Sequence, residues 1–320
     1  MHQQRVTPLT ESGLLAALLV VLGQAAVYLP VLGIVATLMW PLPVIVLVVR
    51  HGLRWGIMGL AVAGVALALL IEPTIAARLV LAFGPTGLCL GWGFRRGWSG
   101  AATLGLGLVG SIGAKLASLG FLFLLTGLNP FDGQMELLRQ SFEESYALYG
   151  QLGVPEQDIA ESRAQIETGL AAVALLLPLI IVIMGLMDTA VSYLLGVRVL
   201  RRLGHTAPVL PPFREWHLPR AFVFLTGFAL VGIYWGQAHD MQPLYSLSVN
   251  ALVCALLAGL VQGLALLSAL MQHFRLSGFV RALIYVLVVI NGLFLQIVAL
   301  TGLFDMLFDY RRRLARREMR

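Results

Sequence analysis

The sequence predicts an all-α, polytopic transmembrane helical bundle with eight or nine membrane segments. Hydrophobic residues make up 59% of the 320-residue chain and charged residues only 12%, whereas a soluble domain carries about 25% charged residues. Apolar runs close to the roughly 17–25 residues that cross a bilayer as a helix recur along the chain. None of these runs alternates in the way that membrane β-strands do. The pattern therefore favours helices in a bilayer.

Six apolar runs precede a polar break, and three follow it. They cover residues 13–29, 31–49, 56–71, 75–92, 99–126 and 169–197, and then 221–237, 244–271 and 282–304. We predict a six-span core at residues 1–197, a basic connector at residues 198–220, C-terminal membrane segments at residues 221–310 and a basic tail at residues 311–320. The first run is long for a signal-peptide core and no cleavage site follows it, so we expect it to be retained.

The arginines predict how the chain is oriented in the membrane. With the N-terminus in the cytoplasm, that side receives twelve of them, Arg5, Arg50, Arg54, Arg95, Arg96, Arg198, Arg201, Arg202, Arg214, Arg220, Arg275 and Arg281. The opposite side receives three, Arg78, Arg139 and Arg163. Because short cytoplasmic loops are enriched in basic residues, the sequence predicts a cytoplasmic N-terminus and a cytoplasmic connector in a bacterial cytoplasmic membrane.

The last apolar run leaves two topologies open. Nine full crossings would place the arginine-rich tail outside, away from the anionic lipid that attracts basic segments on the cytoplasmic side. Asn291 and Gly292 are a plausible helix break inside this run. We therefore predict that it is re-entrant or a tight hairpin and that the tail is cytoplasmic. The alternative is a complete crossing.

Residues 129–168 are the one long polar segment between two predicted spans, and we predict that they lie on the outer face of the membrane. Asn129 followed by Pro130 is a helix start, and apolar residues then recur every three or four positions, at Phe131, Met135, Leu138, Phe142, Tyr146 and Tyr149. Gly150 and Gly153 end this helix, and Pro155 opens a second one. The pattern predicts an extracytoplasmic amphipathic helical hairpin. The alternative is a simple spacer.

Composition and motifs exclude several kinds of chemistry. The net charge of +6 comes from arginines in short loops and in the tail, which reflects membrane topology and not nucleic-acid binding. The histidines lack metal-ligand spacing, and Cys89 and Cys254 lie inside apolar runs. Residues 110–115 lack the spacing of a phosphate-binding loop. We therefore expect no metal, no cofactor, no nucleic-acid partner and no enzymatic activity.

Two ionisable residues inside predicted spans are the main candidates for substrate binding. Lys115 is the single lysine of the chain and lies in the fifth run, and Asp188 lies near the middle of the sixth. Such residues are costly in a bilayer and are often retained for function, so we predict a buried pair with a substrate or ion role. Glu72 and Arg78, which flank an outer turn, are further candidates at the mouth of a site. The alternatives are a structural ion pair, a snorkelling lysine and ordinary loop charges.

Small residues at four-residue spacing predict close helix packing in two runs. The first set is Gly110, Ala114 and Ser118, and the second is Ala251, Ala255, Gly259 and Gly263. Such faces let helix backbones approach closely. We expect packing within the chain, with a partner interface as the alternative.

Several strings resemble the YybS-like family of uncharacterised bacterial membrane proteins. They are Pro211, Pro212, Phe213, Arg214, Glu215 and Trp216 in the connector, the string at residues 262–265, the string at residues 302–305, and Asp309, Tyr310 and Arg311. Strings at residues 30–33, 41–43 and 49–53 also fit, so the resemblance covers nearly the whole chain. It implies a family fold without an established activity. We interpret the connector string with Asp305, Asp309 and Arg311 as a family motif or partner surface. We expect the two aspartates to pair with Arg312, Arg313 or the connector.

The first six spans are similar to the S components of energy-coupling-factor vitamin transporters. The similarity rests on a small-residue first span, a proline-rich second span and a glycine-bounded turn after it. It implies a six-helix core with both ends inside and a ligand pocket that opens outward beneath residues 129–168. The chain departs from that family in its three further C-terminal segments and carries no recognisable vitamin-specific motif.

Two functions follow as hypotheses. The first is a small-molecule binding or transport subunit, with an unknown ligand, that needs a separate energising partner or coupling subunit because the chain has no nucleotide site. The alternative is a non-enzymatic envelope scaffold or assembly factor that contacts other membrane proteins within the lipid bilayer. An intramembrane enzyme is disfavoured because no nucleophile–base pair is recognisable.

Overall fold

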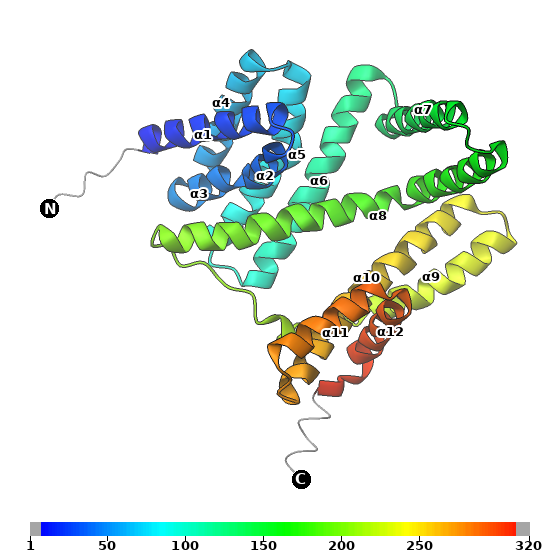
Figure 1. Cartoon of the computed structure of the whole chain (residues 1–320). Coiled ribbons are helices and arrows are strands. Elements are labelled where there is room, and N and C mark those ends of the chain that lie inside the picture. The colour runs from blue at the N-terminus through cyan, green and yellow to red at the C-terminus, as the bar shows by residue number, and fades with distance from the viewer. Residues whose placement is uncertain (1–7, 312–320) are drawn as a thin grey trace, which may run out of the picture. The chain divides into compact units, whose positions relative to one another are not determined.

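The computed structural model describes residues 8–311, and its regular elements are helices (Figure 1). Those before the connector are α1 (Pro8–Tyr28), α2 (Leu32–Met39), α3 (Pro41–His51), α4 (Leu53–Leu70), α5 (Pro73–Arg95), α6 (Gly100–Thr126), α7 (Pro130–Gln151) and α8 (Glu156–Arg202). The later elements are the 3-10 turn η1 (Phe213–Glu215), α9 (Ala221–Ala238), α10 (Gln242–His273), α11 (Gly278–Ile290) and α12 (Gly292–Phe308). No strand occurs within residues 8–311, and the predicted all-α class is confirmed.

Eight spans within this range are long and apolar enough to cross a membrane when α2 and α3 count as one. The bent pair of α11 and α12 raises the number to nine if it is counted as one further span. The predicted range of eight to nine membrane segments therefore agrees with the lengths and composition of the helices.

The chain divides into two compact units. The first contains the described residues up to Leu170 together with Ile180–Leu210. The second contains Ala171–Leu179 and the described residues from Pro211 onward. The predicted connector is thus shared, since its residues up to 210 belong to the first unit and those from 211 belong to the second.

Helix α3 is the centre of the first unit. Its residues 41–48 are all buried, and the helix packs against α1, α4 and α5. Immediately before it, the Trp40 side chain is fully buried and its indole N–H donates to the carbonyl oxygen of Leu19 at 3.1 Å. The predicted second span is interrupted at Trp40 because Pro41 and Pro43 carry no backbone N–H and therefore cannot continue the hydrogen bonds of α2. Pro41 begins the new helix, the position at which proline is well tolerated.

Helices α5 and α6 approach each other through small residues. A Cβ atom added to Gly110 of α6 would lie 2.6 Å from the Sγ atom of Cys89 in α5. Ala114 and Ser118, which share this face of α6, are also buried. The small-residue face at Gly110, Ala114 and Ser118 thus lies inside the first unit.

Helices α7 and α8 contain the predicted hairpin. Asn129 caps α7, because its Oδ1 atom accepts the N–H of Phe131 at 3.1 Å. Tyr146 is buried, and the guanidinium of Arg163 in α8 lies 5.4 Å from the centroid of its ring. Ion pairs join the two arms, between Arg163 and Glu143 at 2.6 Å and between Arg139 and Glu167 at 3.6 Å. Of the predicted apolar stripe, Leu138 and Tyr149 are exposed.

Helix α8 continues from the hairpin into the predicted sixth span without a break (Figure 1). Its 47 residues contain Gly169, which marked the expected start of that span. A single glycine costs about 1 kcal/mol in a helix, which is too little to end one that is supported on both sides. The second hairpin arm and the sixth span are therefore one helix.

Pro178 lies inside α8 and is accommodated by Asn250 of α10, within the second unit. The Asn250 amide donates to the carbonyl oxygen of Leu175 at 2.8 Å, and its Oδ1 atom accepts the N–H of Leu179 at 3.1 Å. A regular helix joins this carbonyl and this N–H to each other by its i to i−4 bond. The buried Asn250 side chain therefore provides the polar partners next to the proline, as lipid cannot.

Helices α10 and α12 form the closest packing of the second unit. A Cβ atom added to Gly259 would lie 2.5 Å from the carbonyl oxygen of Ala299, and one at Gly263 would overlap the carbonyl oxygen of Val298. Gly302 of α12 faces both glycines. Ala255 on the same stripe is fully buried, whereas Ala251 is half-buried. This small-residue face is occupied by α12 of the same chain.

The last apolar run is broken at Asn291, where the helix axis bends by 102° between α11 and α12. The Asn291 side chain caps α12 by accepting the N–H of Leu293 at 3.0 Å. The helix break predicted at this position is present. The tail beyond Arg311 lies outside the described residues.

We predict that Gly263→Ala destabilises the protein by about 1–3 kcal/mol, because the added methyl group meets a backbone carbonyl that cannot rotate away. Thermal unfolding in detergent measures the loss. Gly227→Ala in α9 is the matched control, because apart from the adjoining backbone of α9 itself nothing lies within 4 Å of its added Cβ. Equal melting temperatures for the two variants would contradict the packing described here.

Candidate functional site

Lys115 of α6 and Asp188 of α8 form a buried ion pair in the first unit. The Lys115 ammonium donates to the Asp188 carboxylate and to the Oγ atom of Ser111, the latter at 3.2 Å. It also lies 5.2 Å from the centroid of the Phe83 ring in α5, which adds a cation–π contact. The exposed fractions of the two charged side chains are 10% and 14%. Three helices therefore surround one charge pair inside apolar spans.

Glycines bring α6 and α8 close enough for this pair to form. A Cβ atom added to Gly107 would lie 2.8 Å from the Thr189 side chain, and one at Gly185 would lie 3.1 Å from Ile112. Ser99 caps the start of α6, with its Oγ atom accepting the N–H of Ala102 at 3.3 Å. The small residues determine how closely the helices approach, and the long lysine side chain spans the remaining gap to Asp188.

Hydroxyl groups without a hydrogen-bond partner occur on the three helices that contribute to this site, α5, α6 and α8. Within the described residues, they include the fully buried side chains of Thr86, Thr103, Thr189 and Ser192. Thr189 and Ser192 lie within one turn of Asp188, and Thr86 lies one turn from Phe83. Buried hydroxyls normally have a partner, so such groups indicate a place where water or a polar ligand binds.

Within the described residues, neither Glu72 nor Arg78 forms a hydrogen bond or an ion pair with Lys115 or Asp188. Glu72 is the exposed residue before α5, and its carboxylate accepts a hydrogen bond from the Thr74 hydroxyl. Arg78 is exposed, and no hydrogen bond or ion pair of its side chain occurs among residues 8–311. Whether either residue lines the mouth of a site stays a prediction.

The connector string is held within the second unit by polar contacts. Arg214 donates to the side chain of Gln272 in α10 and forms an ion pair with Glu215 at 3.5 Å. The indole N–H of Trp216 donates to the carbonyl oxygen of Pro211 at 2.9 Å, and its ring packs edge-on against Phe213. Pro212 precedes η1 and accepts the N–H of Glu215 at 2.8 Å. The string is thereby folded into a compact turn.

Asp305 of α12 joins this turn to α10. Its buried carboxylate accepts the Gln262 amide at 2.7 Å, the backbone N–H of Tyr310 at 2.9 Å and the Arg311 guanidinium at 3.4 Å. Gln262 also accepts the backbone N–H of Leu218 at 2.9 Å. Arg311 donates in addition to the carbonyl oxygen of Arg214.

The predicted ion pairs of Asp305 and Asp309 can therefore be compared with the structure only where the partner lies within residues 8–311. Asp305 pairs with Arg311, and Arg312 and Arg313 lie outside the described residues. Asp309 ends α12 in a left-handed conformation with φ of 48°, and its N–H donates to the carbonyl oxygen of Asp305 at 2.9 Å.

Comparison with known proteins identifies the family. Residues 17–306 match the family described as "Predicted membrane protein (DUF2232)". The chain belongs to this family. It is 27% identical over 309 residues to a Bacillus subtilis (strain 168) protein described as "Uncharacterized protein YybS", and the match covers 95% of this chain and 97% of that protein. No solved structure matches the chain.

The family match confirms the YybS-like resemblance of the sequence. The string at residues 262–265, part of that resemblance, contains Gln262, the side chain that joins the connector to Asp305. Sequence reasoning assigned no role to Gln262 and missed Asn250. A buried amide in an apolar run was the available signal for both, because such groups need a partner in the bilayer. The similarity to S components stays a prediction.

We predict that Lys115→Met or Asp188→Leu alone destabilises the protein by about 3–5 kcal/mol, because each leaves an unpaired buried charge. The double variant should recover most of this loss. Thermal unfolding in detergent measures all three. Arg139→Met removes the exposed partner of Glu167 and should cost less than about 1 kcal/mol. Single variants as stable as this control would contradict a buried pair.

Proposed function

We propose that the chain is a non-enzymatic subunit of the bacterial cytoplasmic membrane that binds or transports a small molecule together with a separate energising partner. One observation carries the proposal. The Lys115–Asp188 pair lies inside apolar spans, and unpartnered buried hydroxyls lie on the same helices. The family and its membrane-spanning helices are established, and the ligand-related role is our inference.

Stability alone does not account for a buried ion pair. Replacing such a pair by well-packed apolar residues is often neutral or stabilising, and apolar residues are abundant in α6 and α8. Ionisable groups retained inside spans commonly mark substrate or ion pathways. The position of Lys115 and Asp188 therefore supports a role in recognising a polar or charged ligand.

The charges define the chemistry of a suitable ligand. An ammonium and a carboxylate in direct contact can each exchange their partner for a group of opposite charge on a small molecule. Thr189 and Ser192, next to Asp188 along α8, have free hydroxyl groups to hydrogen-bond to that molecule. We therefore favour a small charged or zwitterionic ligand over an apolar one.

The scaffold hypothesis is our second candidate, and it rests on the connector. Arg214 and Glu215 keep about half of their side-chain surface exposed although they are also bonded within the second unit. An exposed arginine in a rigid turn is a suitable contact for a partner protein. The small-residue stripe of α10 offers less support, because α12 covers its glycines.

We predict that a panel of small anions, cations and zwitterions contains a class that raises the melting temperature of the purified protein. A ligand at about 100 times its Kd stabilises by about 2.7 kcal/mol. The double variant Lys115→Met/Asp188→Leu should lose this stabilisation because it removes both charges without leaving one unpaired. Asp240→Asn, which changes an exposed carboxylate of the second unit that the binding proposal does not use, is the matched control.

Two results would reject the binding role. One is that no class in the panel changes the melting temperature of the wild type. The other is that the stabilisation survives in the double variant. Co-purification of a stoichiometric protein that is lost in Arg214→Gln would then favour the scaffold.

We also predict the orientation of the chain. In a variant with Cys89 and Cys254 replaced by alanine, a cysteine at Gln151 in the hairpin should react with a membrane-impermeant maleimide in spheroplasts. A cysteine at Arg96, in the turn after α5, should react only after lysis, because the arginine distribution places this turn in the cytoplasm. The reverse labelling pattern would refute this orientation.

A further inference from the structure

A groove of about 330 Å³ lies in the first unit and shares no residue with the Lys115 site. Its volume is at the lower end of ligand pockets, which enclose about 300–1,000 Å³. Its walls come from α1, α2, α3 and α8, and they are apolar except at Glu11 and Arg50. The lining includes Leu15, Leu18 and Leu22 of α1 and Val199 of α8, together with Glu11 and Arg50.

The groove runs along the helices. Glu11, Leu15, Leu18 and Leu22 follow one another at spacings of four, three and four residues, which places them on one face of α1. At 1.5 Å per residue, this stripe is about 16 Å long. One leaflet of the bilayer core is about 15 Å thick, half of roughly 30 Å. The groove therefore has the length of a lipid acyl chain in one leaflet.

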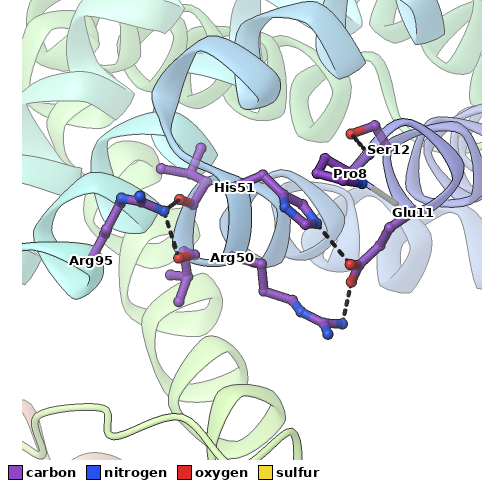
Figure 2. Close-up of polar contacts among 8 residues, drawn as sticks. Pro8, Glu11, Ser12, Arg50, His51 and Arg95 are labelled. Atoms are coloured by element: carbon purple, nitrogen blue, oxygen red, sulfur yellow. Dashed lines mark hydrogen bonds and ion pairs between the residues drawn. The ribbon is translucent and has the colours of Figure 1, made fainter. Parts of the chain in front are cut away.

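Charged groups gather at one end of the groove, where α1 begins and α3 ends. Figure 2 shows the Glu11 carboxylate between the side chains of Arg50 and His51. The His51 Nε2 atom lies 2.7 Å from Glu11 Oε2, and Arg50 donates to Oε1. Arg95 donates to the carbonyl oxygens of Val48 and Val49, at 3.3 and 3.0 Å, and so caps the end of α3 (Figure 2).

Arg50 has donors left for a further anion. Only one of its terminal nitrogens bonds to Glu11, and 41% of its side chain is exposed. Both Glu11 oxygens are occupied, and its side chain is only 12% exposed, so this carboxylate positions Arg50 instead of repelling a ligand from outside. On α8, the exposed Arg202 follows the lining residue Val199 by three residues, a spacing that places both on neighbouring positions of the helix surface.

We propose that this groove binds one acyl chain of an anionic phospholipid, with the lipid phosphate on Arg50. The shape and the charge distribution match this ligand, since a phospholipid has a long apolar chain and a charged group at one end only. Basic pockets between membrane helices commonly bind lipid head groups. Arg202 adds a second positive charge for a head group that carries a net negative charge.

Native mass spectrometry of the purified full chain tests the proposal. The delipidated protein is incubated with equal amounts of dioleoyl-phosphatidylglycerol and dioleoyl-phosphatidylcholine, and the bound lipid is counted. We expect a preference of about fivefold or more for the anionic lipid, since each basic residue near the surface contributes about that factor. Arg50→Gln should reduce binding of phosphatidylglycerol by about fivefold.

Two further variants guard against misfolding as the explanation. Glu11→Gln/Arg50→Gln removes both charges, leaves no unpaired carboxylate and should also lose the preference. Leu18→Trp fills the groove from a side chain that is 45% exposed, so it should fold and should lower the binding of both lipids. Arg54→Gln and Leu14→Trp are the matched controls, because both residues are exposed and neither lines the groove.

Two outcomes would overturn the proposal. Equal binding of the two lipids, unchanged by Arg50→Gln and Leu18→Trp, would show that the groove holds no specific lipid. Unchanged lipid binding in Leu18→Trp together with the loss of a co-purifying protein would assign the groove to a helix of a partner.

Discussion

The absence of water in the bilayer core constrains every other feature of this structure. A polar group there needs a partner, and the buried charged and amide side chains named below find theirs within the protein. Lys115 bonds to Asp188 and Ser111 across α6 and α8. Asn250 bonds to the backbone beside Pro178, and Gln262 bonds to Asp305. These contacts connect helices that are far apart in the sequence and give the apolar packing its specificity.

Small residues make these polar contacts geometrically possible. Gly107 and Gly185 bring α6 and α8 together around the charge pair, and Gly259, Gly263 and Gly302 do the same for α10 and α12. The glycine stripe and the amide network of the second unit act together, because Gln262 directly precedes Gly263. Backbone groups of the connector bond to Gln262 and to Arg311 in this network. The family strings in the connector and at residues 309–311 therefore have a structural role, whether or not they also bind a partner.

The two proposals place different ligand chemistry in different parts of the first unit. The Lys115–Asp188 pair is enclosed by helices and suits a small charged molecule, whereas the groove between α1, α3 and α8 is apolar with one charged end and suits a lipid. The two proposals depend on different residues, so either can fail without the other. Both are compatible with membership of the DUF2232 family, whose description specifies only a membrane protein.

The sequence by itself determined the fold class, the spans and the helix break at Asn291, because hydropathy, capping and helix-breaking act over a few neighbouring residues. It also pointed to Lys115 and Asp188, since charges inside apolar runs stand out. It could not predict that α8 continues through Gly169 or that Asn250 supports Pro178. Only the tertiary structure decided that Gly302 covers the stripe of α10, and that Glu11 meets Arg50 and His51 at the end of a groove. Such contacts join residues about 40 or more positions apart, and their energies depend on distances that no local pattern encodes.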